Sequence, residues 1–247
     1  QDILMEEVNA DNPTEYRTEE GWKKFRTRQS IINVADGTPK TLTLRWSDNG
    51  PILPLDMFGL ASVTPRGHVP ALSFSALSPA DTTMSAAFDM IQAENVTDAI
   101  AALEGYIAPS QNVTFIDRDS IGFKVIGAMP KRSISHQTQG RMPALGWVRD
   151  NQWDGRLPYS ANPEVINPDT GIIGNTNNKT TDASFPNHVS FEWGDSQRIN
   201  RLKRLMEMRK VHTRESLIEA QLDTVSFTAQ SLLPLIGKEL WFTGEAG

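Results

Sequence analysis

The most informative stretch of this sequence is Gly171-Ile172-Ile173-Gly174-Asn175-Thr176-Asn177-Asn178. Its apolar first half predicts a short buried strand, and an asparagine-rich run follows where that strand ends. An asparagine amide in such a place can donate hydrogen bonds to a developing negative charge without carrying a charge of its own. That is the chemistry of an oxyanion hole. A simple asparagine-rich turn is the alternative interpretation of the same residues.

The rest of the chain predicts a mixture of strands and helices around this stretch. Alternation of apolar and polar residues predicts strands or hairpins over residues 2–8, 22–46, 69–75 and 111–128. Apolar residues at helical spacing predict helices over residues 84–91, 96–103, 195–210 and 214–225. Residues 129–170 contain five prolines and predict a long loop-rich segment. This order of elements indicates an α+β fold.

The apolar positions of the expected helices are specific enough to test. The first helix carries Met84, Ala87, Phe88 and Ile91 at helical spacing. The next carries Val96, Ala99, Ile100 and Leu103. In the helix over 195–210 we expect four residues to face inward: Ile199, Leu202, Leu205 and Met206. Thr213 is placed to cap the helix that follows.

Composition excludes several classes of function. The chain has 247 residues, with 24 Lys and Arg against 30 Asp and Glu, and a net charge of −6. A mildly acidic chain is a poor nucleic-acid binder, and the basic run from Arg198 to Arg214 is interpreted as a solvated helix face. The sequence has no cysteine, which excludes disulfides, thiolate metal sites and cysteine nucleophiles. No apolar run approaches the roughly 18 residues of a membrane helix, so we expect neither a nucleic-acid nor a membrane partner.

Short segments along the whole chain occur in an order typical of one enzyme family. They are Gln1-Asp2 through Asn12-Pro13, Ser110-Gln111-Asn112-Val113, Leu145-Gly146-Trp147, Asn151 to Tyr159, Asn162 to Gly171, Ser190 to Ile199, and Asp223 with Ser226. This succession resembles the β-subunit of the penicillin acylase family of N-terminal-nucleophile hydrolases. The resemblance extends over essentially the whole chain and lies in the shared order of segments rather than in one motif.

The resemblance implies a fold and a division of the chain. Residues 1–247 are expected to be a single internal fragment of a β-subunit that forms part of the four-layer αββα core of these hydrolases. Within it, residues 1–128 would supply strands and two helices, and residues 129–194 the loop-rich segment and the active-site strand. Residues 195–236 would supply the last helices.

The resemblance also implies an activity. Family members cut their own precursor into two chains and hydrolyse an N-acyl amide of the penicillin, cephalosporin or acyl-homoserine-lactone type. The nucleophile is a serine at the β-chain's N-terminus, with its own α-amino group as base. Gln1 corresponds to a position inside the family's β-chain, so we expect no nucleophile in this chain and no activity from it alone. The expected partners are the rest of the β-chain and the α-chain, and the expected location is the periplasm or the exterior.

Five residues match functional positions of the family. Asn177 corresponds to the oxyanion-hole asparagine, and Arg198 to an arginine that organises the catalytic centre. Gln111 corresponds to a wall of the acyl pocket, where a polar residue departs from the usual apolar one. Asp2 and Asn187 correspond to ligands of a structural calcium ion, with Asn187 replacing a more usual Asp. Apart from calcium, no cofactor is expected.

A second interpretation follows from Gln1 and Gln111. The chain could belong to a binding or scaffold module that keeps the architecture of the family without its chemistry. Such a module would bind a ligand or a partner and would form no acyl-enzyme.

Overall fold

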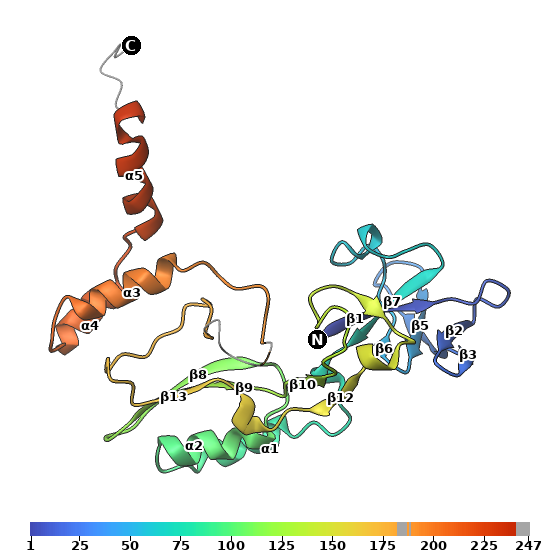
Figure 1. The fold of residues 1–247 in the computed structure, drawn as a ribbon, viewed down its shortest axis with the longest axis horizontal. Helices are drawn as coiled ribbons and strands as arrows, with labels where there is room; N and C mark the ends of the chain where they lie inside the picture. Colours follow the sequence, from blue (N-terminus) through green and yellow to red (C-terminus); the bar gives the residue numbers. More distant parts are fainter. Residues whose placement is uncertain (182–186, 188, 241–247) are drawn as a thin grey trace. The chain divides into compact units, whose positions relative to one another are not determined.

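The computed structural model describes residues 1–181, 187 and 189–240 (Figure 1). The chain forms two compact units, each assembled from three separate segments. Unit 1 comprises residues 1–93, 98–111 and 125–162, and unit 2 comprises residues 94–97, 112–124 and the chain from 163 onward. The two units therefore interleave along the sequence. The expected division at residues 128 and 194 differs from this, because it follows the order in which strands, loops and helices occur along the chain.

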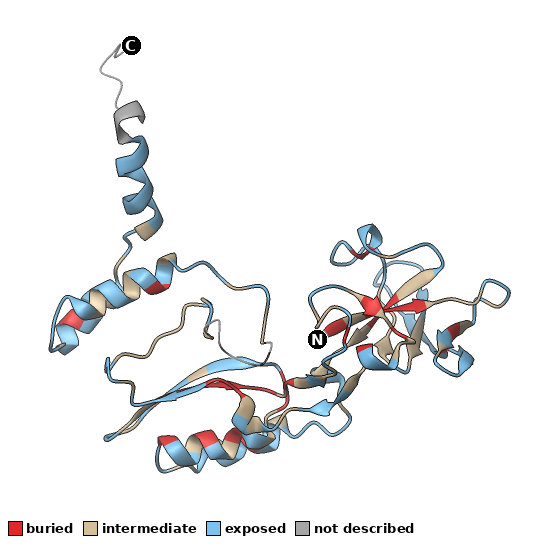
Figure 2. Ribbon diagram, in the orientation of Figure 1, coloured by how far each residue is buried: buried red, intermediate tan, exposed pale blue. Residues whose placement is uncertain are grey.

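The centre of unit 1 is a three-stranded sheet of order β11-β1-β7. Strand β1 (Asp2–Glu7) pairs antiparallel with β7 (His68–Ser73) and parallel with β11 (Ala144–Leu145). The strands expected over residues 2–8 and 69–75 are confirmed. Strand β1 is the central strand of this sheet, and its side chains are mostly buried, polar ones included (Figure 2).

Two further antiparallel sheets follow β1 along the chain. One consists of β2 (Glu15–Thr18) and β3 (Gly21–Lys24), and the other of β4 (Arg26–Ile32), β5 (Lys40–Ser47) and β6 (Gly50–Pro51). Strands β4 and β5 pair along their whole length, which confirms most of the hairpin expected over residues 22–46. Residues 22–24 at the start of that range are not part of this hairpin, because they belong to β3, which pairs with β2. Tyr16 and Phe25 are both buried there, with ring centroids 4.8 Å apart.

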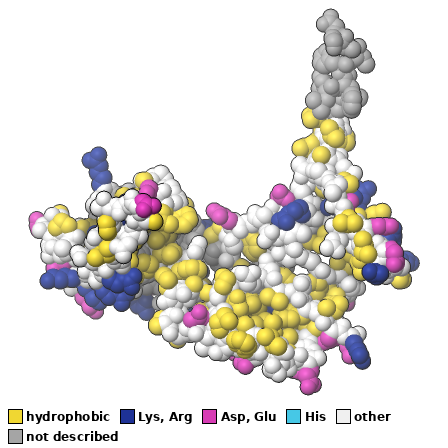
Figure 3. All heavy atoms as spheres, turned by 180° about the vertical axis from the view of Figure 1, so that it is seen from behind, with side chains coloured by type: hydrophobic (Ala, Val, Ile, Leu, Met, Phe, Trp, Pro, Cys, Tyr) yellow, Lys and Arg dark blue, Asp and Glu magenta, His cyan; other side chains and the backbone are white. Residues whose placement is uncertain are grey.

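The first two helices form where the apolar spacing predicts them. They are α1 (Thr83–Ile91) and α2 (Val96–Ala102). Val96, Ile100 and Leu103 are buried, as an inward apolar face requires. The apolar face of α1 differs, since Met84 and Phe88 are 67% and 64% exposed. Hydrophobic side chains accordingly gather on the surface of the structure (Figure 3).

The loop-rich segment expected over residues 129–170 is confirmed; besides two 3-10 turns at 149–151 and 159–161, it contains four short strands. They are β10 (Pro130–Arg132), β11, β12 (Trp153–Arg156) and β13 (Glu164–Ile166). Strand β10 pairs with β12, and β13 joins the second hairpin. That hairpin consists of β8 (Gln111–Ile116) and β9 (Ile121–Ile126), in a sheet of order β13-β9-β8. The hairpin expected over residues 111–128 is thus confirmed.

Unit 2 ends in three helices, α3 (Gln197–Glu207), α4 (Arg214–Gln221) and α5 (Phe227–Leu240). Thr213 caps α4 as expected, in a capping box with Ser216. Of the four residues expected to face inward on α3, Ile199 is buried and the other three are half-buried. Arg201 from the basic run pairs with Asp223 at 2.6 Å, which supports a structural role for that run. None of the described helices combines the length and apolarity needed to cross a membrane.

Candidate active-site loop

Residues 171–174 do not form the buried strand that the sequence predicts. They have no regular secondary structure, Gly171 is exposed, and the next three residues are half-buried. A strand needs a neighbour to pair with, and this segment instead packs closely on helix α3. A Cβ atom added to Gly174 would lie 2.7 Å from Leu202 Cδ2, closer than carbon atoms can approach. The close approach to α3 places the asparagines that follow beside the start of that helix.

The asparagine run folds into a turn that its own side chains hold. Asn175 Oδ1 accepts hydrogen bonds from the Asn177 backbone N–H and from Asn112 Nδ2, both at 3.0 Å. Asn178 Oδ1 accepts from the Thr176 backbone N–H at 3.0 Å. Asn177 sits in the left-handed region at a φ of 67°, which asparagine tolerates better than most residues. The alternative of an asparagine-rich turn is therefore correct as a description of the backbone.

The side chains of Asn177 and Arg198 meet in this turn. Arg198 Nη2 donates to Asn177 Oδ1 at 2.9 Å and also to the Thr176 carbonyl oxygen. Because an arginine can only donate, the contact fixes the amide oxygen of Asn177 on the arginine side and turns the NH2 group away. That NH2 group donates no hydrogen bond to any residue that the structure describes. The loop thus presents a neutral, oriented donor at the surface of unit 2.

A groove of about 920 Å³ lies beside this turn within unit 2. Asn112 and Asn175 form part of its wall, so the groove borders the turn that carries Asn177. Its apolar lining comes from the β8–β9 hairpin, the 171–174 segment and helix α3. The apolar residues are Phe115, Ile116, Ile121, Phe123, Ile172, Ile173, Leu202 and Met206.

Two further residues have an expected role, Gln111 in the acyl pocket and Asn187 at the calcium site. Gln111 is the first residue of β8, is exposed and belongs to unit 1. Asn187 lies in a bend of unit 2 and is half-buried. Their roles in substrate and calcium binding remain predictions.

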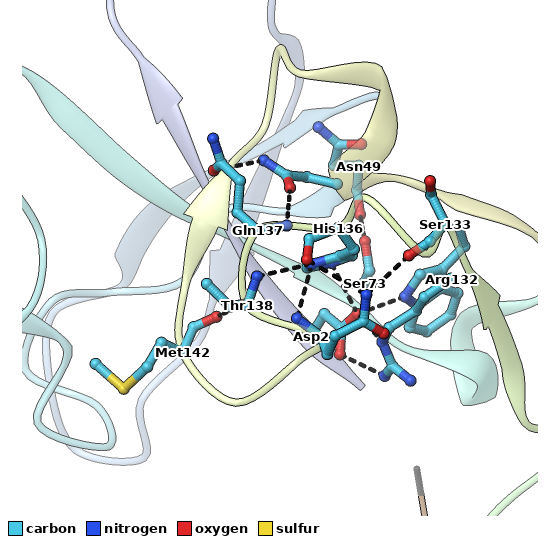
Figure 4. A network of polar contacts seen from close by, with 12 residues as sticks. Asp2, Asn49, Ser73, Arg132, Ser133, His136, Gln137, Thr138 and Met142 are labelled. Atoms are coloured by element: carbon cyan, nitrogen blue, oxygen red, sulfur yellow. Dashed lines mark hydrogen bonds and ion pairs between the residues drawn. The ribbon is translucent and has the colours of Figure 1, made fainter. Parts of the chain in front are cut away.

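Asp2 is a carboxylate of unit 1 that three hydrogen bonds hold (Figure 4). It is buried, and both of its oxygens accept hydrogen bonds. Arg132 donates from Nη2 to Oδ1 at 2.6 Å and from Nε to Oδ2 at 2.8 Å, and Trp153 Nε1 donates to Oδ2 at 2.6 Å. Burial alone would raise the pKa of Asp2, but hydrogen bonds from Arg132 and Trp153 outweigh it and hold the pKa below its usual value.

His136 completes this cluster as a neutral side chain. Its Nδ1 accepts hydrogen bonds from the backbone N–H groups of Thr138 and Gln139 at 3.2 and 3.0 Å, so the ring proton is on Nε2. Nε2 lies 3.9 Å from Asp2 Oδ2 and has no closer partner among the described residues. Burial lowers the pKa of His136, which favours this neutral form.

The surroundings of Asp2 do not fit a calcium ion. A cation bound to this carboxylate would face the guanidinium of Arg132, which already neutralises it and occupies both oxygens. Within the described ranges, no three acidic or histidine side chains are grouped as a metal would require. In this arrangement Arg132 provides the positive charge that calcium would otherwise supply at Asp2.

Glu6 is a second buried carboxyl group on the same strand. It is 0% exposed, and its Oε1 accepts a hydrogen bond from Asn49 Nδ2 at 2.9 Å. Its Oε2 has no hydrogen-bond partner in the described part of the chain. Burial raises the pKa of Glu6, more than hydrogen bonding lowers it, because an ionised carboxylate is poorly solvated there.

The raised pKa of Glu6 predicts a pH-dependent cost to stability. Its charged form is disfavoured in the folded state, so its contribution to stability is greatest below the unfolded pKa and falls as pH rises through the folded pKa. We expect Glu6→Gln to raise the unfolding midpoint at pH 8 and to leave it nearly unchanged at pH 4. Thermal unfolding of both proteins across this pH range measures the difference. Glu20→Gln, at an exposed carboxylate of the same unit, is the control. An equal gain in that variant, or none in Glu6→Gln, contradicts the expectation.

Comparison with known proteins identifies the class of this fold and site. Residues 1–246 match the family model described as penicillin amidase. The acyl-homoserine lactone acylase QuiP of Pseudomonas aeruginosa is 25% identical over 237 residues, covering 94% of this chain and 28% of that protein. Penicillin G acylase of Escherichia coli is 26% identical over 210 residues, covering 84% of this chain and 24% of that protein. The solved thermostable penicillin G acylase from Alcaligenes faecalis superposes with a TM-score of 0.80 at 19% identity, covering all of this chain and 43% of that chain.

The chain therefore belongs to the penicillin amidase family of N-terminal-nucleophile hydrolases, with an α+β fold that matches part of penicillin G acylase. It spans 28% and 24% of the two relatives' lengths. The resemblance found in the order of its sequence segments is thereby confirmed. Its homologues include acylases named for acyl-homoserine lactones and for penicillin G.

Proposed function

We propose that this chain supplies the oxyanion-binding loop of an acylase that hydrolyses an N-acyl amide. The observation that carries the proposal is the contact between Arg198 Nη2 and Asn177 Oδ1 at 2.9 Å, which leaves the Asn177 NH2 group as an oriented donor. The substrate class is an acylated amine of the penicillin or acyl-homoserine-lactone type, in line with the names of the homologues, or of the cephalosporin type that the family resemblance implies.

In the proposed reaction the nucleophile lies outside this chain. The hydroxyl of an N-terminal serine attacks the amide carbon, and the free α-amino group accepts the hydroxyl proton. The carbonyl oxygen becomes negative, and the Asn177 NH2 group stabilises it by a hydrogen bond. The C–N bond then breaks, the proton passes to the leaving amine, and water hydrolyses the acyl-serine ester. The serine, its share of the αββα core and the α-chain would come from the remainder of the same precursor.

Labelling of the full-length protein tests this proposal against the scaffold alternative. An enzyme of this kind should react with a sulfonyl fluoride at an N-terminal serine, with one label in each molecule. Intact mass and N-terminal sequencing of the separated chains locate the label. A full-length protein with no such serine, or one that takes up no label, would leave the binding or scaffold module as the function.

Arg198 should act on turnover rather than on stability. We expect Arg198→Ala in the full-length enzyme to lower kcat by about 10–100-fold, because an amide freed from the guanidinium can rotate away from the oxyanion. The unfolding midpoint should barely change, since Arg198 is exposed. Steady-state kinetics and thermal unfolding measure both quantities. Arg204→Ala is the matched control, because Arg204 is also exposed on helix α3. Full activity in Arg198→Ala would mean that Arg198 belongs only to a solvated helix face.

A further inference from the structure

The segment at the start of helix α3 holds Asn177 at two points. Arg198 holds the side chain, as described above. The Gly194 backbone N–H holds the main chain by donating to the Asn177 carbonyl oxygen at 2.8 Å. Asn178 and Gly194 also form a parallel β-bridge. Only three residues, 195–197, therefore separate the anchor of the Asn177 backbone from the anchor of its amide.

Gly194 makes this contact because it has no side chain. A Cβ atom added to Gly194 would lie 2.9 Å from the Asn177 carbonyl oxygen, 3.2 Å from its carbonyl carbon and 3.3 Å from its Cβ. All three atoms belong to Asn177, and none of them is the far end of a flexible side chain. Any side chain at position 194 must therefore displace Asn177 relative to residue 194.

The requirement at Gly194 is one of space rather than of backbone conformation. Gly171, for example, lies at a φ of +64° in the left-handed region, where any side chain is strained. Gly194 lies outside that region, so an alanine can adopt its backbone angles. The consequence of Gly194→Ala thus falls on the position of Asn177 and not on the local fold of residue 194.

We propose that Gly194 is a positioning residue for the oxyanion donor. Its N–H and its missing side chain set the main chain of Asn177, and Arg198 then sets the direction of the amide. This inference rests on the proposed role of Asn177 as the donor. A displacement of the order of 1 Å in a catalytic group costs about 100-fold in rate. Gly194→Ala should therefore act on kcat far more than on substrate binding.

A double-mutant cycle in the full-length enzyme tests the inference. The variants are Gly194→Ala, Asn177→Gly and the two combined, with kcat, KM and the unfolding midpoint measured for each. We expect Gly194→Ala alone to lower kcat by about 10–100-fold, with KM within about threefold of the parent. In the Asn177→Gly background, adding Gly194→Ala should change kcat by less than about twofold, because the amide that it misplaces is already gone.

Gly105→Ala is the matched control. A methyl group there meets Thr82 and Ala86 at ordinary distances, 3.4 Å and above, so activity should be unchanged. If Asn177→Gly itself leaves kcat unchanged, the proposed function of Asn177 fails. If Asn177→Gly lowers kcat and Gly194→Ala does not, the positioning role of Gly194 is overturned. An equal loss from Gly194→Ala in both backgrounds, or a loss explained by a lower unfolding midpoint, overturns it as well.

Discussion

Replacing Asn177 in the full-length enzyme should lower kcat by about 10²–10³-fold, the usual cost of removing one oxyanion-hole donor. The loss should fall on kcat rather than on KM, because the NH2 group bonds to an oxygen that is negative only during the reaction. Asn177→Gly is the cleaner variant. Glycine accepts the left-handed φ of 67° at this position, whereas alanine adds a backbone cost of about 1–2 kcal/mol that is unrelated to catalysis.

Steady-state kinetics of Asn177→Gly and Asn177→Ala separate these two effects. Both should lose kcat alike, and only the alanine variant should lose stability. Lys179→Ala is the control, because it removes an exposed side chain two residues away. An Asn177→Gly enzyme with the parent kcat would mean that the donor lies elsewhere in the protein.

The second large effect is expected at Arg132. Arg132→Met should lower the free energy of unfolding by about 3–5 kcal/mol, because it leaves the buried carboxylate of Asp2 without its partner. Asp2→Asn combined with Arg132→Met should be less damaging than Arg132→Met alone, since the unpaired charge is then removed. Denaturant unfolding of the parent and of both variants measures the differences. Lys131→Met is a neighbouring control, because its ion pair with Asp154 at 3.1 Å is more than half exposed and should contribute at most about 1 kcal/mol.

Acid should weaken the same pair. The pKa of Asp2 is lowered in the folded state, so its stabilisation is present above the unfolded pKa and is lost as pH falls through the folded pKa. Calcium and EDTA should leave the unfolding midpoint unchanged, because Arg132 already neutralises Asp2. A midpoint that rises with added calcium would restore Asp2 as a metal ligand. An Arg132→Met protein as stable as its parent would contradict the importance of the pair.

Local patterns predicted most of the elements correctly. The hairpin of β8 and β9 and the helices α1, α2 and α3 follow from alternation or helical spacing over a few residues. The prediction of a strand over residues 171–174 was wrong. An apolar run indicates that a segment packs against another part of the protein, but it does not indicate whether that part is a strand or a helix. Here the neighbour is helix α3 rather than a strand.

The candidate site was predicted in part. Asn177 and Arg198 were identified from the order of segments along the chain, and the structure brings their side chains together. Gly194 was missed, although a glycine three residues before the first residue of helix α3 is visible in Trp193-Gly194-Asp195. Arg132 was missed because it lies 130 residues from Asp2 and no local pattern links the two.

By itself, the sequence determined the α+β composition, the positions of the principal hairpins and helices, and membership of a family, since these depend on short-range spacing and on the order of segments. The tertiary structure alone decided which charges and amides meet: Arg132 with Asp2, Arg198 with Asn177, and the bare backbone of Gly194 with the carbonyl of Asn177. The physical reason is that hydrogen bonds and ion pairs act over a few ångströms. Only the folded chain brings groups so distant in sequence within that range.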